Sequence, residues 1–363
     1  MKILFLVTHL MGGGAERTVS YLSKYMAHNG CEVSILSITD DIFYQIDPKV
    51  NLVTLGIDSK SNNLFDRIFK ALKRRILIEK NIKEIAPDVV FCIMPPNVKH
   101  TIRLRKKMKF KVITSERANP NFISNSKTTE FHFKMFDASD GVVFQTDRAK
   151  KLFKEDIQKK SVVIHNAVGN ELVYECPHAL ERKNTISAMG RLSDQKDYPT
   201  LIKAFAAVLK KHPDFTLEIY GDGPDKNKLI NHIDELGLSD KVILRGVHGD
   251  AILQMANSAC YVMSSKFEGM PNALMEAMGI GLPCVSTDCP FGPAELIEDG
   301  VNGVLVPVGD AEKMADSISK FIEDKEFAAK CGENAKKILQ NHSIESISKQ
   351  YLDFICDVVN QDN

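Results

Sequence analysis

Short apolar runs alternate with longer amphipathic segments along nearly all of the 363 residues, and this alternation limits the fold more than any other feature. The runs expected to form strands are Ile3–Val7, Glu32–Ser37, Val89–Cys92, Lys111–Thr114, Gly141–Phe144, Ser161–Ile164, Thr185–Met189, Thr216–Tyr220, Lys241–Leu244, Cys260–Met263, Pro283–Ser286 and Gly303–Val306. The expected helices include Glu16–His28, Tyr198–Lys211, Asp225–Leu236, Asn272–Met278 and Ala311–Glu323. Strands that alternate with helices predict βαβ units and parallel sheets with helices on both faces.

The length and one break in this pattern predict two such domains. A domain typically has about 150 residues, so a chain of this length favours two. Periodicity is lost over Val173–Lys183, which contains a proline and precedes a new strand. We therefore predict a first domain at residues 1–175 and a second at 176–342. Residues 343–363 are expected to form a helix that can pack back on the first domain.

The formal net charge is zero, but the two halves carry opposite charges. Residues 1–180 contain 28 basic and 19 acidic side chains, and residues 181–363 contain 19 basic and 28 acidic ones. Most of the positive excess comes from Arg67–Lys83, which has interleaved apolar residues, and from Lys99–Lys111. A basic amphipathic helix of this kind can lie on an anionic membrane surface. One alternative is a solvated helix whose apolar face is core. A nucleic-acid partner is not expected, because no binding motif or aromatic interleaving accompanies the charge.

Several classes of protein are disfavoured by what the sequence lacks. No run approaches the ~20 apolar residues of a membrane-spanning helix, and the N-terminus lacks the small-residue cleavage site of a secretory signal. The eight cysteines are scattered, and the histidines form no HExxH cluster. A P-loop and a D-x-D triplet are also missing. We therefore expect a cytoplasmic protein that needs no metal or other cofactor.

A glycine-rich turn follows the first expected strand. Gly13 and Gly14 lie there, immediately before a helix, where glycine lets the backbone approach a ligand and free N–H groups attract an anion. The dinucleotide-binding fingerprint needs a small third residue, and Arg17 occupies that position. The pattern therefore argues against an NAD-binding site, and a turn that binds no ligand remains an alternative.

The second half places charged side chains beside two expected strand ends. Arg191 and Lys196 follow one strand, where open α/β sheets bind ligands, and this pair of cations suits a diphosphate. Glu268 and Glu276 surround the start of a helix that follows another strand. These carboxylates could accept hydrogen bonds from ribose or sugar hydroxyls. Alternatively, they are solvated acids that the helix dipole favours.

Four segments, taken together, resemble the family-4 glycosyltransferases: GGGAER, GRLSDQK, YGDGPDKNKL and FEGMPNALMEAMGIGLPCVSTDCPFGPAELI. The resemblance spans essentially the whole chain and is densest from 185 to 310. It implies the α/β GT-B fold, in which two Rossmann-like doubly wound domains face each other across a cleft, and a retaining mechanism. Glu268 and Glu276, with seven residues between them, match the E-x7-E motif of that family.

The resemblance also implies roles for individual residues. The catalytic candidates are Glu268, which would contact the transferred sugar, and Arg191 and Lys196, which would hold the donor diphosphate. Glu276 would bind the ribose. The remaining candidates for binding the nucleotide sugar are Gly13, Gly14, Asn166, Arg245, Gly269, Met270, Pro271 and Asn272.

One segment departs from the family pattern. Many members have a histidine near the reacting sugar, where this chain has Glu116 and Arg117, which thus become the acceptor-side candidates. The variant resembles members that act in capsule, O-antigen and other surface-glycan pathways.

The expected function is therefore a retaining transfer of a hexose or N-acetylhexosamine from a nucleotide diphosphate sugar, which we expect to be UDP-linked. The expected acceptor is a lipid-linked glycan in surface polysaccharide biosynthesis, and the expected location is the inner face of the cell membrane, as a peripheral protein. The alternatives are a UDP-sugar 2-epimerase of similar architecture and a non-catalytic subunit that binds a nucleotide sugar.

Overall fold

The computed structural model describes residues 1–11, 13–58, 63–117, 127–169, 171–176 and 181–361. The chain divides into two compact units, one formed by Met1–Gly169 with Ile344–Asn363 and the other by Asn170–Ser343. The first unit is thus left after Gly169, whereas the sequence predicts a domain boundary after residue 175. Residues 177–180 of the predicted linker lie outside the described part of the chain.

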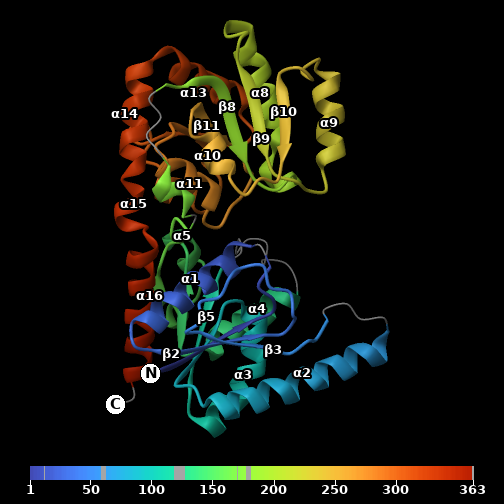
Figure 1. The fold of residues 1–363 in the computed structure, drawn as a ribbon, viewed down its shortest axis with the longest axis vertical. Coiled ribbons are helices and arrows are strands. Elements are labelled where there is room, and N and C mark those ends of the chain that lie inside the picture. The colour runs from blue at the N-terminus through green and yellow to red at the C-terminus, as the bar shows by residue number, and fades with distance from the viewer. Residues whose placement is uncertain (12, 59–62, 118–126, 170, 177–180, 362–363) are drawn as a thin grey trace. The chain divides into compact units, whose positions relative to one another are not determined.

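The first unit, which carries the labels β2, β3 and β5 in Figure 1, is built on a seven-stranded parallel sheet. The strand order is β3-β2-β1-β4-β5-β6-β7. Its strands are β1 (Lys2–Val7), β2 (Glu32–Ser37), β3 (Asn51–Thr54), β4 (Val89–Cys92), β5 (Lys111–Glu116), β6 (Gly141–Phe144) and β7 (Ser161–Val163). Its helices are α1 (Gly14–His28), α2 (Leu64–Ile85), α3 (Pro95–Met108), α4 (Lys127–Ala138), α5 (Asp147–Lys150), α6 (Glu155–Lys159) and α16 (Ile344–Asn360).

The strands of the first sheet match the predicted runs except for β3. Strands β4 and β6 are buried along their whole length, as expected for strands covered on both faces. Strand β3 was not predicted, because it is a short edge strand whose two apolar residues are only half-buried.

The last helix belongs to the first unit. Helix α16 packs against α1, and its Tyr351, Ile355 and Val358 are buried in the same core as Val19 and Leu22 of α1. The chain therefore leaves this unit after Gly169 and returns to it at Ile344.

The second unit is built on a six-stranded parallel sheet of order β10-β9-β8-β11-β12-β13. Its strands are β8 (Lys183–Met189), β9 (Thr216–Tyr220), β10 (Val242–Gly246), β11 (Ser258–Met263), β12 (Cys284–Thr287) and β13 (Val304–Val306). Its helices are α7 (Leu172–Glu175), η2 (Asp194–Lys196, a 3-10 turn), α8 (Tyr198–Lys211), α9 (Lys226–Glu235), α10 (Ala251–Met255), α11 (Asn272–Gly279), α12 (Pro293–Leu296), α13 (Ala311–Glu323), α14 (Lys325–Lys336) and α15 (Ile338–Asn341).

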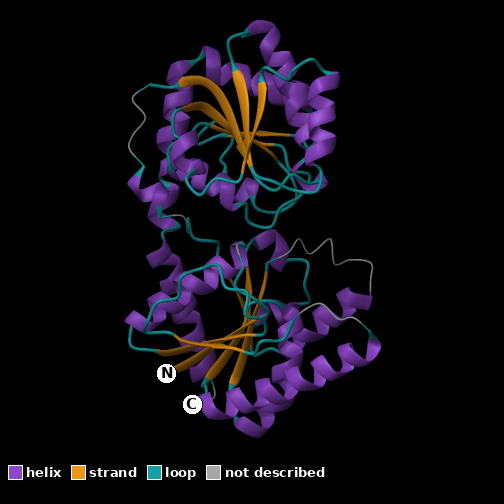
Figure 2. Cartoon of the chain, turned by 45° about the vertical axis from the view of Figure 1, so that its right-hand side comes forward, coloured by secondary structure: helices purple, strands orange, loops and turns teal. Residues whose placement is uncertain are grey.

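Helices cover both faces of each sheet (Figure 2), so both units have the doubly wound architecture that the alternating pattern predicts. The core of the second unit joins α8 and α13 to the sheet through Leu201, Phe205, Ile219, Ile318 and Phe321. In the described part of the chain no helix combines the length and apolarity that crossing a membrane requires.

Candidate active site

Four charged residues predicted in the second unit lie on the segments that follow two neighbouring strands, at one edge of its sheet. Strands β8 and β11 are parallel neighbours, so their carboxyl ends meet at the same edge. Arg191 follows β8 and is exposed, and Lys196 ends η2 a few residues later. Glu268 lies between β11 and α11, and Glu276 lies within α11. The fold therefore brings together residues that are far apart in the sequence.

Lys196 and Glu268 form an ion pair. The Nζ atom of Lys196 lies 2.6 Å from Oε1 of Glu268, and the side chains are only 16% and 8% exposed. Ser265 donates a hydrogen bond from Oγ to the same carboxylate oxygen over 2.7 Å. The two residues that the sequence assigns to the diphosphate and to the sugar thus touch each other. An ion pair this well shielded from water interacts more strongly than one on the surface.

The loops that carry this pair are tied together by further hydrogen bonds. Gln195 donates from Nε2 to the backbone carbonyl of Phe267 at 2.9 Å. Ser264 donates from Oγ to the carbonyl of Lys196 at 2.7 Å, and Thr287 donates from Oγ1 to the carbonyl of Ser265 at 2.6 Å. Sequence reasoning missed these supporting side chains. A hydroxyl residue three positions before Glu268 was the one available signal for Ser265.

Both acidic residues of the E-x7-E motif are buried. Glu268 is 6% exposed and Glu276 is 5% exposed, so the alternative of two solvated acids at a helix start is wrong. Met270 and Pro271 are buried between them, and Gly269 and Asn272 are half-buried. Burying a carboxylate costs free energy unless hydrogen-bonding or charged partners compensate for the lost water. Two buried carboxylates therefore favour a functional role for this motif.

Two tyrosines and a cysteine beside the pair stay uncharged. Tyr198 donates from its hydroxyl to the carbonyl of Gly190 at 3.0 Å, and Tyr261 donates to the carbonyl of Met189 at 3.3 Å. Burial raises the pKa of both phenols. Burial, with the nearby Glu268 carboxylate, also raises the pKa of Cys289 to about 12. The Cys289 thiol is therefore protonated at neutral pH and cannot act as a thiolate nucleophile.

The YGDG segment at the end of β9 needs its glycines because another part of the backbone passes close by. A Cβ atom on Gly221 would lie 2.0 Å from the carbonyl oxygen of Gly190, and one on Gly223 would lie 2.3 Å from that of Leu192. The amide of Leu192 in turn donates to the carbonyl of Asp222 at 3.0 Å. These contacts hold the backbone on both sides of Arg191.

Arg245 lies at the carboxyl end of β10, the edge strand of the sheet. Its guanidinium pairs with Glu218 of β9, which also accepts a hydrogen bond of 2.7 Å from Tyr220. Arg245, a predicted contact of the nucleotide sugar, thus lies at the same edge of the sheet as Arg191 and is bound to a neighbouring strand.

The candidates in the first unit lie at the carboxyl edge of its own sheet. Gly13 and Gly14 join β1 to α1, and Tyr44 donates to the carbonyl of Gly13 at 3.0 Å. Glu116 ends β5 and is buried. Arg117 follows it and donates a hydrogen bond of 3.1 Å to Oδ1 of Asn166.

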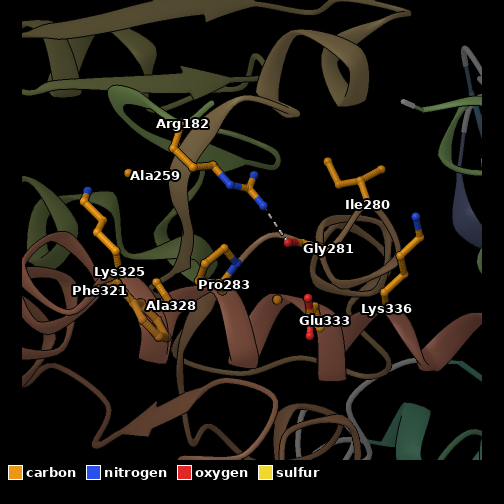
Figure 3. Close-up of a pocket in the computed structure, with 12 residues that line it drawn as sticks. Arg182, Ala259, Ile280, Gly281, Pro283, Phe321, Lys325, Ala328, Glu333 and Lys336 are labelled. Carbon is orange, nitrogen blue, oxygen red and sulfur yellow. Dashed lines mark hydrogen bonds between the residues drawn. The ribbon is translucent and has the colours of Figure 1, made fainter. Parts of the chain in front are cut away.

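A cavity of about 400 Å³ lies elsewhere in the second unit (Figure 3). Its lining includes Arg182, Ala259 and Pro283, which stand at or just before the starts of β8, β11 and β12. The cavity therefore lies at the amino edge of the sheet, opposite the edge that carries Lys196 and Glu268. Among the described residues no group of three or more His, Cys, Asp or Glu side chains could hold a metal ion.

Comparison with known families gives consistent matches for both units. Residues 12–171 match the model of Glycosyltransferase Family 4, and residues 177–338 match the model of Glycosyl transferases group 1. An uncharacterized glycosyltransferase of Haemophilus influenzae is 26% identical over 353 residues, covering 96% of this chain and 98% of the relative.

A second relative has a named activity. The Campylobacter jejuni GalNAc-alpha-(1->4)-GalNAc-alpha-(1->3)-diNAcBac-PP-undecaprenol alpha-1,4-N-acetyl-D-galactosaminyltransferase is 24% identical, with 99% of each chain covered. Among solved structures, Anabaena Alr3699/HepE in complex with UDP has a TM-score of 0.79 and 19% identity. That match covers 98% of this chain and 100% of the other. The predicted pair of Rossmann-like domains is confirmed.

Proposed function

Because the chain belongs to the glycosyltransferases that these two family models describe, we propose that it is a retaining enzyme of surface polysaccharide biosynthesis. It moves a hexose or N-acetylhexosamine from a nucleotide diphosphate sugar, UDP-linked in this proposal, to a lipid-linked glycan. The observation that carries the proposal is the buried pair of Lys196 and Glu268 at the carboxyl edge of the second sheet.

The cations at this edge suit a diphosphate leaving group. When the bond between the sugar and the diphosphate breaks, negative charge develops on the diphosphate oxygens, and preorganised cations stabilise that charge. Lys196 supplies a point charge, and the exposed Arg191 supplies a planar fork that can bind two oxygens. Both follow β8, and the close contacts of Gly221 and Gly223 fix the backbone around Arg191. Lys196 leaves its partner Glu268 when the donor diphosphate binds.

Glu268 and Glu276 bind hydroxyl groups of the donor. Glu276 accepts hydrogen bonds from the ribose, while Glu268, freed from Lys196 and still held by Ser265, accepts from the transferred sugar. Donor contacts also come from Asn272 and the backbone of Gly269, Met270 and Pro271. Arg245 at the end of β10 lies beside the base. Gly13, Gly14 and Asn166 of the first unit complete the proposed donor contacts.

The reaction proceeds on the front face of the sugar. The anomeric carbon loses its bond to the diphosphate oxygen, and the acceptor hydroxyl oxygen forms a bond to the same face of that carbon. The hydroxyl proton passes to the departing diphosphate, so the anomeric configuration is retained. Arg191 and Lys196 carry the charge of the diphosphate, which makes a metal unnecessary in this proposal.

Helix α2 supports contact of the first unit with a membrane surface. Leu64, Phe65, Ile68, Phe69, Leu72 and Ile76, which we call the α2 stripe, are between 54% and 85% exposed. With residues spaced about 100° apart, the stripe fills an arc of about 140° on one side of the helix. Lys70 and Arg74 lie on the opposite side and are half-buried. The alternative that this apolar face is core is therefore wrong.

An exposed apolar stripe that is flanked by cations matches an interfacial helix. The first two-thirds of α2 turns its apolar side to solvent, and its core contacts come from Ile78 and Ile82 near its end. Such a helix buries its apolar face at the boundary of headgroups and acyl chains, and basic residues add about 1 kcal/mol each on an anionic surface. The lipid-linked acceptor named for the Campylobacter relative is consistent with this location.

A donor panel tests the proposal. The purified protein is incubated with UDP-glucose, UDP-galactose, UDP-N-acetylglucosamine, UDP-N-acetylgalactosamine, GDP-mannose and ADP-glucose, and release of the nucleoside diphosphate is measured. We expect slow hydrolysis of at least one UDP-sugar and faster release when a polyprenyl-diphosphate glycan is added. Conversion of a UDP-sugar to its 2-epimer without release of UDP would show an epimerase instead. Binding without turnover of any donor would indicate a non-catalytic subunit.

A further inference from the structure

Arg117 joins four separate segments at the carboxyl edge of the first sheet. Its Nε donates to Oγ of Ser115 at 3.1 Å, and its Nη2 donates to the hydroxyl of Tyr351 at 2.7 Å. Its Nη1 donates to Oγ1 of Thr18 at 2.9 Å and to Oδ1 of Asn166 at 3.1 Å. The partners belong to β5, α16, α1 and the segment after β7.

These bonds use most of the hydrogen-bonding capacity of the side chain. A guanidinium has five N–H groups in a fixed plane, and four donor interactions are directed at protein groups. These four accepting groups are three hydroxyls and one amide oxygen, and none of them is a carboxylate. A side chain committed in this way is poorly suited to bind an acceptor, which is the role that the sequence suggests for it.

One branch of this hydrogen-bond network reaches Gly13 and Gly14, which join β1 to α1 and which we call the glycine loop. The hydroxyl of Thr18 accepts from Arg117 and donates to the carbonyl oxygen of Gly14 at 3.0 Å. A threonine hydroxyl has one hydrogen and two lone pairs, so it can do both at once. Arg117 is therefore connected through two hydrogen bonds to the residue that begins α1.

The other branches reach the two places where the chain passes between units. Asn166 lies three residues before the end of the first segment at Gly169. Tyr351 belongs to α16, the helix that begins where the chain returns at Ile344. The Tyr351 side chain is fully buried, so its hydroxyl needs a partner such as Arg117.

We infer that Arg117 is a positioning residue that does not bind the acceptor. It holds the glycine loop, the segment that ends at Gly169 and helix α16 in a single arrangement. The inference rests on the proposed function, because the glycine loop matters for turnover only if a donor diphosphate binds beside it. Holding such a loop in place before the donor arrives contributes to rate through orientation.

Hydrolysis of a UDP-sugar without acceptor separates the two roles. An arginine that binds only the acceptor does not change the rate of this hydrolysis, whereas an arginine that positions the glycine loop does. We expect Arg117→Lys and Thr18→Val to lower the turnover number for hydrolysis about tenfold, and Tyr351→Phe to lower it about threefold. Thr18→Ser keeps the hydroxyl and should hydrolyse at the wild-type rate. The substrate is whichever of the four UDP-sugars in the donor panel the wild type hydrolyses fastest.

A matched control removes a similar number of bonds elsewhere. Arg182 donates to the backbone carbonyls of Ala256, Ser258 and Gly281 at the amino edge of the second sheet. Figure 3 shows the bond to Gly281. Arg182→Lys should lower the melting temperature without changing hydrolysis per folded molecule. Wild-type hydrolysis by Arg117→Lys with a raised KM for acceptor would overturn the inference. So would equal hydrolysis by Thr18→Val and Thr18→Ser.

Amide hydrogen exchange tests the network independently of catalysis. Arg117→Lys should speed exchange both at the start of α1 and in α16, relative to the wild type and Arg182→Lys. Unchanged protection in both helices would overturn the inference even if the enzyme is active. If exchange changes as expected while no donor is ever turned over, the network stands and the proposed function fails.

Discussion

Lys196 in the second unit and Arg117 in the first are cations at the carboxyl edges of similar sheets, yet they are held in opposite ways. Lys196 pairs with the carboxylate of Glu268, whereas Arg117 bonds to hydroxyl and amide oxygens of four segments. An incoming anion can replace one carboxylate partner of a lysine. Replacing the partners of Arg117 would release all four segments. In our proposal, Lys196 of the second unit therefore exchanges its partner for an anionic ligand, whereas Arg117 holds elements of the first unit in place.

The largest effect is expected from Glu268→Gln, which keeps the shape of the side chain and removes its charge. If Glu268 contacts the transferred sugar, release of UDP in the presence of acceptor should fall about 10²- to 10³-fold, as when one preorganised polar contact to a transition state is lost. Glu235→Gln, an exposed carboxylate at the end of α9, is the matched control and should leave the rate unchanged. A rate above one-tenth of the wild-type rate would contradict the proposal that Glu268 contacts the transferred sugar.

Next in size is Lys196→Ala, compared with Arg191→Ala. Lys196→Ala leaves the buried Glu268 without its cation, so we expect about a 100-fold loss in kcat/KM for the donor and a lower melting temperature. Arg191 is exposed, and Arg191→Ala should cost about tenfold, or about 1.4 kcal/mol. Steady-state kinetics with varied donor concentration measures both. Equal donor kinetics in Lys196→Ala and wild type would show that Lys196 does not bind the donor diphosphate.

A smaller effect is expected on membrane binding. Replacing Phe65 and Phe69 of the α2 stripe by serine removes two exposed rings, and burial of such a side chain contributes about 1.5–3 kcal/mol when it is complete. Because penetration at an interface is partial, we expect about 30-fold weaker binding to phosphatidylglycerol vesicles in co-sedimentation. Ile230→Ser, at an exposed apolar residue of α9 in the second unit, is the control. Equal binding by both variants would show that the α2 stripe does not contact the bilayer.

The smallest effect is expected from chelation. If Arg191 and Lys196 carry the diphosphate charge alone, saturating EDTA should change the rate of UDP release less than twofold. Restoration of a lost rate by Mg²⁺ or Mn²⁺ would mean that a metal shares this task.

The alternating pattern was sufficient to predict both sheets, because strands buried on both faces appear as continuous apolar runs. It could not reveal β3, whose Asn51–Thr54 has only two half-buried apolar residues at an edge. Spacing and the family resemblance predict Glu268 and Lys196 as site residues, but their direct contact depends on how the loops after β8 and β11 fold together. The support from Ser265 depends on the same loops.

Two features needed the structure because the same sequence pattern fits opposite arrangements. An amphipathic helix such as α2 can direct its apolar side inward or outward, and only packing decides which. Arg117 appears in the sequence as a polar residue beside a strand end, and its partners Thr18 and Tyr351 are 99 and 234 residues away. No local pattern encodes such contacts.

The binding site of the donor diphosphate is tested most directly by calorimetric titration of UDP into the wild type, Arg182→Lys and the double variant Arg191→Ala with Lys196→Ala. We predict that the wild type and Arg182→Lys bind UDP with the same affinity, and that the double variant binds at least 100-fold more weakly while remaining folded. Unchanged UDP binding by the double variant would contradict the claim that the donor diphosphate is held at the carboxyl edge of the second sheet.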